Sequence, residues 1–157
     1  MEHSNVEATR NSSTFSLQYD VSIEINAEPE TIWPYLVNAA DYPNWNSTVD
    51  RVEGEIAEGE KIKVFAKISP NRAFPVVVSH LEPPKKMVWT GGMPLGLFKG
   101  VRTFLLTPGA DGNTTVSMSE QFTGLMVPLM AGSMPDLRPA FIGFAADLKT
   151  VAEGKVS

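Results

Sequence analysis

The chain has 157 residues, of which 43% are hydrophobic and 20% charged, as expected for one globular domain rather than a disordered chain. Its net charge of −5 disfavours nucleic acid as a partner, because phosphates attract a basic surface. The chain has no cysteine, which excludes disulfides, thiolate nucleophiles and cysteine-bound metals, and no motif indicates a metal site or a cofactor. No run reaches the roughly 20 apolar residues of a membrane span. No signal-peptide pattern is present either, so we expect a cytoplasmic protein.

The first elements expected are a tail, a strand and two short helices. Residues 1–14 are almost all polar and predict a flexible tail, followed by a single domain over residues 15–157. Apolar residues alternate with mostly polar ones from Phe15 to Ile25, which indicates a half-buried strand. Pro29 and its acidic neighbours favour a helix start, and a second short helix or turn is expected just before Trp45.

The sequence predicts a series of strands in the middle of the chain and a helix at its end. Alternating segments separated by turn residues predict strands at about 48–56, 60–69, 74–81, 85–90, 100–108 and 114–123. From Met134 to Ala152, apolar residues recur every three or four positions along one helix face. Pro128, Pro135 and Pro139 leave the start of this helix open. The order indicates an α+β fold in which an antiparallel sheet of about seven strands buries one face against the C-terminal helix.

The last strand carries an acidic residue among apolar ones. Glu120 shares its face with Met118 and Phe122, whereas the residues between them are polar and are expected to face solvent. A hairpin turn that ends at Gly112 would place Arg102 opposite Glu120. Because a buried carboxylate without a partner costs several kcal/mol, we expect the two to form an ion pair. The pair could be purely structural, anchor a ligand's polar group, or supply an acid–base residue.

Four segments, taken in their order and spacing, carry a resemblance to a known superfamily. They are Ile25–Trp33, Tyr42–Asn46, Leu81–Trp89 and Glu120–Leu125. With the closing helix, the chain from about residue 17 to 153 resembles the START-like superfamily, also called SRPBCC or helix-grip, and most closely its polyketide cyclase/dehydrase and lipid-transport branch. The resemblance implies a curved sheet wrapped around the long helix. The prolines near the helix start depart from the uninterrupted helix that is usual there.

The candidate pocket combines large apolar side chains with the one charged pair. We expect a ligand to contact Trp45, Trp89, Met93, Phe98, Arg102, Phe104, Met118, Glu120, Phe122, Phe141 and Phe144. For each apolar member taken singly, a core position is the better expectation, and only the set as a whole favours a binding cavity. In the resembled fold, two apolar loops at 93–98 and 125–130 would lie near the opening, where exposed leucines and methionines could touch a membrane or another protein.

These features favour a protein that binds or carries a small hydrophobic or amphipathic molecule without transforming it. One alternative is an enzyme of the polyketide cyclase or dehydratase type, in which Glu120, helped by Arg102, would move protons. The other is a protein-interaction module that uses the two apolar loops.

Overall fold

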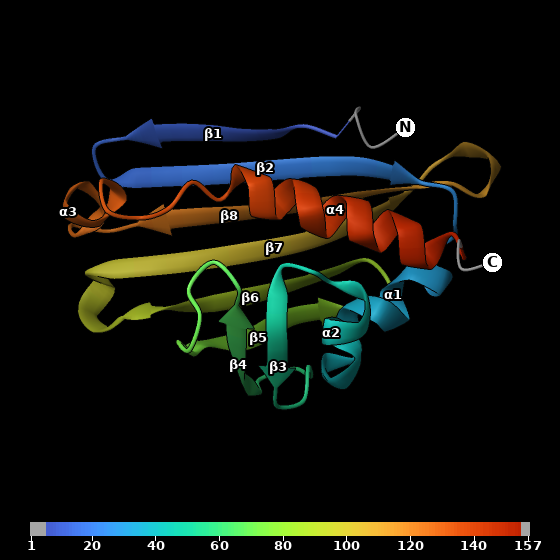
Figure 1. Ribbon diagram of the computed structural model, residues 1–157, viewed down its shortest axis with the longest axis horizontal. Coiled ribbons are helices and arrows are strands. Elements are labelled where there is room, and N and C mark those ends of the chain that lie inside the picture. The colour runs from blue at the N-terminus through green and yellow to red at the C-terminus, as the bar shows by residue number, and fades with distance from the viewer. Residues whose placement is uncertain (1–5, 155–157) are drawn as a thin grey trace.

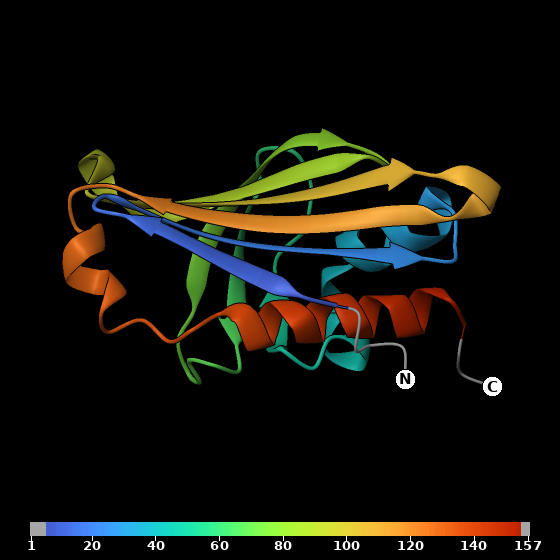
Figure 2. The same cartoon turned by 90° about the horizontal axis from the view of Figure 1, so that it is seen from above.

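The chain forms one curved antiparallel sheet, with a long helix lying across the concave face (Figures 1 and 2). The computed structural model describes residues 6–154, and the eight strands follow the spatial order β1-β2-β8-β7-β6-β5-β4-β3. The elements in chain order are β1 (Ala8–Ser13), β2 (Ser16–Ile25), α1 (Pro29–Val37), η2 (Ala39–Asp41), α2 (Tyr42–Trp45), β3 (Val49–Glu53), β4 (Lys61–Ala66), β5 (Phe74–Glu82), β6 (Lys86–Met93), η3 (Pro94–Gly96), β7 (Phe98–Pro108), η4 (Ala110–Gly112), β8 (Thr114–Thr123), α3 (Val127–Ala131) and α4 (Arg138–Ala152).

The α+β fold and its antiparallel sheet agree with the sequence prediction, but the sheet has eight strands instead of seven. The additional strand is β1, which pairs with β2 from Ala8↔Val21 to Ser13↔Ser16. The prediction of a flexible tail over residues 1–14 is therefore wrong for β1, while residues 1–5 of that tail lie outside the described residues. All β1 residues after Ala8 are exposed. An edge strand of this kind needs only backbone pairing, so it lacks the apolar alternation that marks a buried strand.

The inner face of the sheet supplies one wall of the core. In β2, each second residue from Leu17 to Ile25 is buried, as the alternation predicts. The β7–β8 hairpin has the predicted register, in which Phe104 pairs with Met118. Its turn residues Asp111 and Gly112 both have positive φ, of 59° and 78°.

Helix α4 supplies the opposite wall, but it covers only part of the sheet (Figure 1). Its buried residues are Phe141, Phe144, Ala145, Leu148 and Ala152. The helix begins at Arg138, which places Pro139 in the first turn. Backbone N–H groups there have no partner within the helix, so the N–H that proline lacks costs no hydrogen bond. Pro128 lies in the first turn of the separate short helix α3, and Pro135 lies in the connection between α3 and α4. This connection and α3 lie beyond the N-terminal end of α4 (Figure 2).

None of the helices in the described part of the chain is both long and apolar enough to cross a membrane.

Candidate functional site

An ion pair lies on the concave face of the sheet. Arg102 of β7 and Glu120 of β8 are directly opposite in register, as the sequence predicts. The Arg102 Nε donates a hydrogen bond to Glu120 Oε1 at 2.6 Å, and the Nη2 atom lies 2.6 Å from the same oxygen. The two side chains remain 27% and 14% exposed, so solvent reaches the pair.

The ion pair belongs to a row of inner-face side chains that crosses four adjacent strands. Trp89 of β6 is opposite Arg102, and Tyr19 of β2 is opposite Glu120. The Tyr19 hydroxyl accepts a hydrogen bond from Arg10 Nε of β1 at 3.2 Å. Phe141, in the first turns of α4, faces this row: its ring centroid is 5.8 Å from that of Tyr19 and 5.3 Å from the Arg102 guanidinium carbon. The charged groups are thus flanked by aromatic rings.

Gly100 of β7 leaves room for the side chains next to the Arg102–Glu120 ion pair. A Cβ atom at Gly100 would lie 3.1 Å from the Phe122 ring and 3.3 Å from Glu120 Oε2, which is closer than most side chains allow. Phe122 in turn stacks on Phe98, with ring centroids 5.4 Å apart. Gly100 therefore lets the Glu120 carboxylate and the Phe122 ring lie against the backbone of β7.

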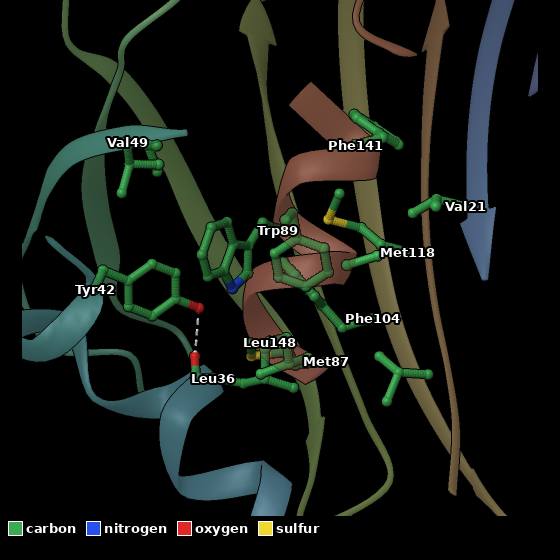
Figure 3. Packing of buried hydrophobic residues seen from close by; sticks show 14 of the residues in the cluster. Val21, Leu36, Tyr42, Val49, Met87, Trp89, Phe104, Met118, Phe141 and Leu148 are labelled. Carbon is green, nitrogen blue, oxygen red and sulfur yellow. Dashed lines mark hydrogen bonds between the residues drawn. The ribbon is translucent and has the colours of Figure 1, made fainter. Parts of the chain in front are cut away.

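On the other side of the pair, an aromatic cluster fills the space between the sheet and the helices (Figure 3). The Trp89 and Phe104 centroids are 4.8 Å apart, and Phe144 of α4 lies 5.9 Å from Phe104 and 6.0 Å from Trp45. Tyr42 contacts both tryptophans, at 5.1 Å from Trp45 and 6.3 Å from Trp89. All of these residues are buried.

Two hydrogen-bond donors in this cluster have no acceptor. Within residues 6–154, the indole nitrogens of Trp45 and Trp89 are the buried side-chain N or O atoms without a hydrogen-bond partner. A buried donor without an acceptor costs about 1–3 kcal/mol, so natural cores rarely keep one. The Tyr42 hydroxyl, by contrast, donates to the Leu36 carbonyl at 2.7 Å. Burial raises the pKa of this hydroxyl, and the positive charge of Arg102 offsets part of the increase.

The structure brings most of the predicted pocket residues into one continuous region. Those that are buried together are Trp45, Trp89, Phe104, Met118, Phe122, Phe141 and Phe144. Phe98 joins them through Phe122, whereas Met93 is 42% exposed at the far end of the β6–β7 hairpin. Sequence reasoning did not include Tyr19 and Tyr42. The alternation of β2 could have placed Tyr19 on the inner face, but nothing local marks Tyr42 as buried.

The convex face of the sheet carries a hollow of about 310 Å³. It is open to solvent and lined by Glu7, Thr9, Asp20, Val21, Ser22, Thr103, Leu105, Ser117 and Ser119. Most of the lining residues are polar by type, and Thr103 and Ser119 lie on the side of the sheet opposite Arg102 and Glu120, so this hollow is not the pocket that the sequence predicts. Across the described residues, no three His, Asp or Glu side chains are grouped so as to hold a metal ion.

The architecture and the family match together define the class of protein. The curved antiparallel sheet closed by a long C-terminal helix, together with the family match over residues 16–153, identifies a START-like, helix-grip protein. Residues 16–153 match the family described as polyketide cyclase / dehydrase and lipid transport, and the chain belongs to this family.

Solved structures of low sequence identity share the fold. An aromatase/cyclase, Zhui from Streptomyces sp. R1128, has a TM-score of 0.69 at 10% identity over 90% of this chain and 96% of that one. A START superfamily protein from Mycobacterium smegmatis has a TM-score of 0.64 at 16% identity over 88% and 99% of the two chains. A protein from Rhodobacter sphaeroides has a TM-score of 0.68 at 18% identity over 96% and 100%. No curated protein matches the chain in sequence.

Proposed function

We propose that the protein binds a small amphipathic molecule between the sheet and α4, with the polar group of that molecule at Arg102 and Glu120. The observation that carries this proposal is a solvent-accessible ion pair set in an otherwise apolar wall. A binding site for such a molecule needs a large apolar surface and a few polar groups that fix its orientation. Membership of a family that includes lipid transport supports the proposal.

The ion pair offers the polar group of the ligand both a hydrogen-bond donor and a hydrogen-bond acceptor. The Arg102 guanidinium donates hydrogen bonds to a carbonyl or carboxylate oxygen, and the Glu120 carboxylate accepts one from a hydroxyl. The apolar body would lie along Phe141 and toward the aromatic cluster. There, the indole N–H groups of Trp45 and Trp89 offer hydrogen bonds to any further acceptor oxygen.

Entry would occur at the N-terminal end of α4. The connection between α3 and α4 contains no helix, and its Met134 and Leu137 are only partly buried against the core. Aromatic side chains already fill the space between the sheet and the helices. A bulky ligand would therefore have to displace Met134 and Leu137 and rotate the aromatic rings beneath them.

Binding can be tested with an environment-sensitive probe, anilinonaphthalene sulfonate, which is apolar and carries one anionic group. We expect saturable fluorescence enhancement and a roughly tenfold weaker Kd for Arg102→Met, because a charge-assisted hydrogen bond contributes about 1.5–3 kcal/mol. Lys67→Met is the matched control, since it also removes one cation, from an exposed pair with Asp50. An equal loss in both variants, or no saturable binding by the wild type, would contradict the proposal.

An enzyme of the cyclase or dehydratase type is the second candidate. It is favoured by the position of the Glu120 carboxylate, which is close to solvent yet flanked by Phe122 and fixed by Arg102. Native mass spectrometry of the protein purified from cells would identify a co-purifying molecule. If Glu120→Gln retains that molecule but stops its conversion, the protein is an enzyme; if the molecule is unchanged by the wild type, it is a carrier.

A further inference from the structure

Three chain segments meet at one end of the sheet, beyond the N-terminal end of α4 (Figures 1 and 2). They are the β1–β2 turn, the β6–β7 turn that contains η3, and the β8–α3 turn. The Gly124 N–H donates to the Phe15 carbonyl at 3.2 Å, and the Met126 N–H donates to the Leu97 carbonyl at 2.9 Å. Gly124 has φ +128°, and a Cβ atom there would lie 2.4 Å from the Leu97 carbonyl oxygen. These contacts hold the three turns together as one platform.

This end, which we call the apolar tip, exposes large apolar side chains. Its members are Phe15, Met93, Leu95, Leu97, Leu125 and Leu129. Leu95 is 94% exposed, Leu129 73% and Leu125 70%. Elsewhere in the described residues, the large apolar side chains that are exposed reach at most 41%, and they are spread over other elements. Exposed apolar groups gathered at one place indicate a contact surface.

The apolar tip is also free of charge. Residues 91–98 and 124–135 contain no Asp, Glu, Lys or Arg, although 20% of the chain is charged. The nearest charges in sequence are the exposed Lys99 and an ion pair between Asp136 and Arg138 at 2.7 Å. Protein-binding hot spots are rich in Trp, Tyr and Arg, and leucine is under-represented among them. Four of the six members of the apolar tip are leucines, which come from the β6–β7 turn, the β8–α3 turn and α3, and this composition suits insertion into a fluid apolar phase.

We propose that the apolar tip docks the protein on the surface of a lipid bilayer, with its leucines inserted among the acyl chains. The absence of a basic cluster means that attraction to anionic headgroups contributes little, so binding depends on buried apolar area. The tip adjoins the α3–α4 connection, so the docked protein would turn the end that carries Arg102 and Glu120 toward the membrane. The docking itself does not depend on the function proposed above.

The first test is flotation of the purified protein with phosphatidylcholine vesicles. We expect the wild type to float with the vesicles, with little change between low and high salt. The double variant Leu95→Glu/Leu125→Glu should lower the partition coefficient about tenfold or more, because interfacial binding scales with the apolar area buried. Leu105→Glu is the matched control: it lies on the convex face of the sheet, is 41% exposed and should bind as the wild type does.

A second measurement uses the lack of cysteine in the chain. Leu95→Cys and Leu105→Cys each give one site for an environment-sensitive dye, and both variants leave the core intact. With the same vesicles, we expect a blue shift for the dye at position 95 and none at position 105.

Several results would overturn the proposal. These are a wild type that stays unbound, equal losses in the tip and control variants, or binding that requires anionic lipid and disappears in salt. If the wild type instead forms a dimer that the double variant dissociates, while neither binds vesicles, a second copy of the chain covers the tip. Circular dichroism melting confirms that each variant is folded. Binding of anilinonaphthalene sulfonate at Arg102 is measured separately, so either proposal can fail without the other.

Discussion

At the scale of single residues, the ion pair between Arg102 and Glu120 combines two effects that are usually separate. The two side chains are less exposed than those of a surface ion pair and more exposed than those of a fully buried one. A surface pair contributes about 0–1 kcal/mol, whereas removing one partner of a buried pair costs about 3–5 kcal/mol. The energy that this pair contributes to folding should therefore lie between these limits.

Arg102→Met should lower the free energy of unfolding by about 1–3 kcal/mol at neutral pH, because it leaves the Glu120 carboxylate partly buried without its cation. Adding Glu120→Gln should restore part of this loss, since the amide carries no charge to desolvate. Urea denaturation of both single variants and the double variant measures the coupling. Lys67→Met, from the exposed pair with Asp50, should cost no more than about 0.5 kcal/mol. An Arg102→Met effect as small as that of Lys67→Met would show that the pair contributes nothing to the fold.

The pair itself was predictable because it forms within one hairpin. The alternation of β8 assigns Glu120 to the inner face, and the turn at Gly112 fixes which residue of β7 lies opposite. The unpaired indole N–H groups were not predictable. They result from α2, β6 and α4 meeting in space, and no local pattern specifies which acceptor each tryptophan will find.

At the scale of elements, every strand that the sequence predicts is present, with ends that differ by up to three residues, as at β6, which was expected to end at residue 90 and extends to Met93. β2, β7 and β8 alternate clearly because the core lies on one side of them and solvent on the other. β1 was missed because an exposed edge strand leaves no such pattern. The start of α4 stayed open because three prolines were each compatible with a first turn, and tertiary packing decided among them.

Removing β1 should destabilise the protein, whereas removing a flexible tail would not. Deletion of residues 1–13 removes all pairing with one edge of β2, and each lost backbone hydrogen bond costs about 0.5–1.5 kcal/mol. We therefore expect the free energy of unfolding to fall by roughly 2–4 kcal/mol, measured by urea denaturation. Deletion of residues 1–5, which leaves every residue of β1 in place, is the control. If the two deletions have equal effects, the pairing of β1 does not contribute to stability.

At the scale of the whole molecule, one hydrophobic cluster joins every part of the fold. Its buried members come from the sheet, from α1 and α2, and from α4, and include residues as distant as Ile62 of β4 and Leu148 of α4. Both of these side chains are fully buried. A continuous core of this kind favours a single cooperative unfolding transition, even though α4 spans only part of the sheet.

Differential scanning calorimetry tests this cooperativity. Wild-type protein should unfold in one transition with equal calorimetric and van't Hoff enthalpies. Ile62→Ala and Leu148→Ala, from opposite sides of the core, should each cost about 2–5 kcal/mol, since large-to-small changes leave a cavity. For a chain of this length, each kcal/mol lowers Tm by roughly 2–4 °C, so both variants should move the whole transition by a similar amount. Separate transitions, or a Leu148→Ala effect confined to one of them, would mean that α4 and the sheet unfold independently. The helix could then leave the sheet to admit a ligand while the strands stay folded.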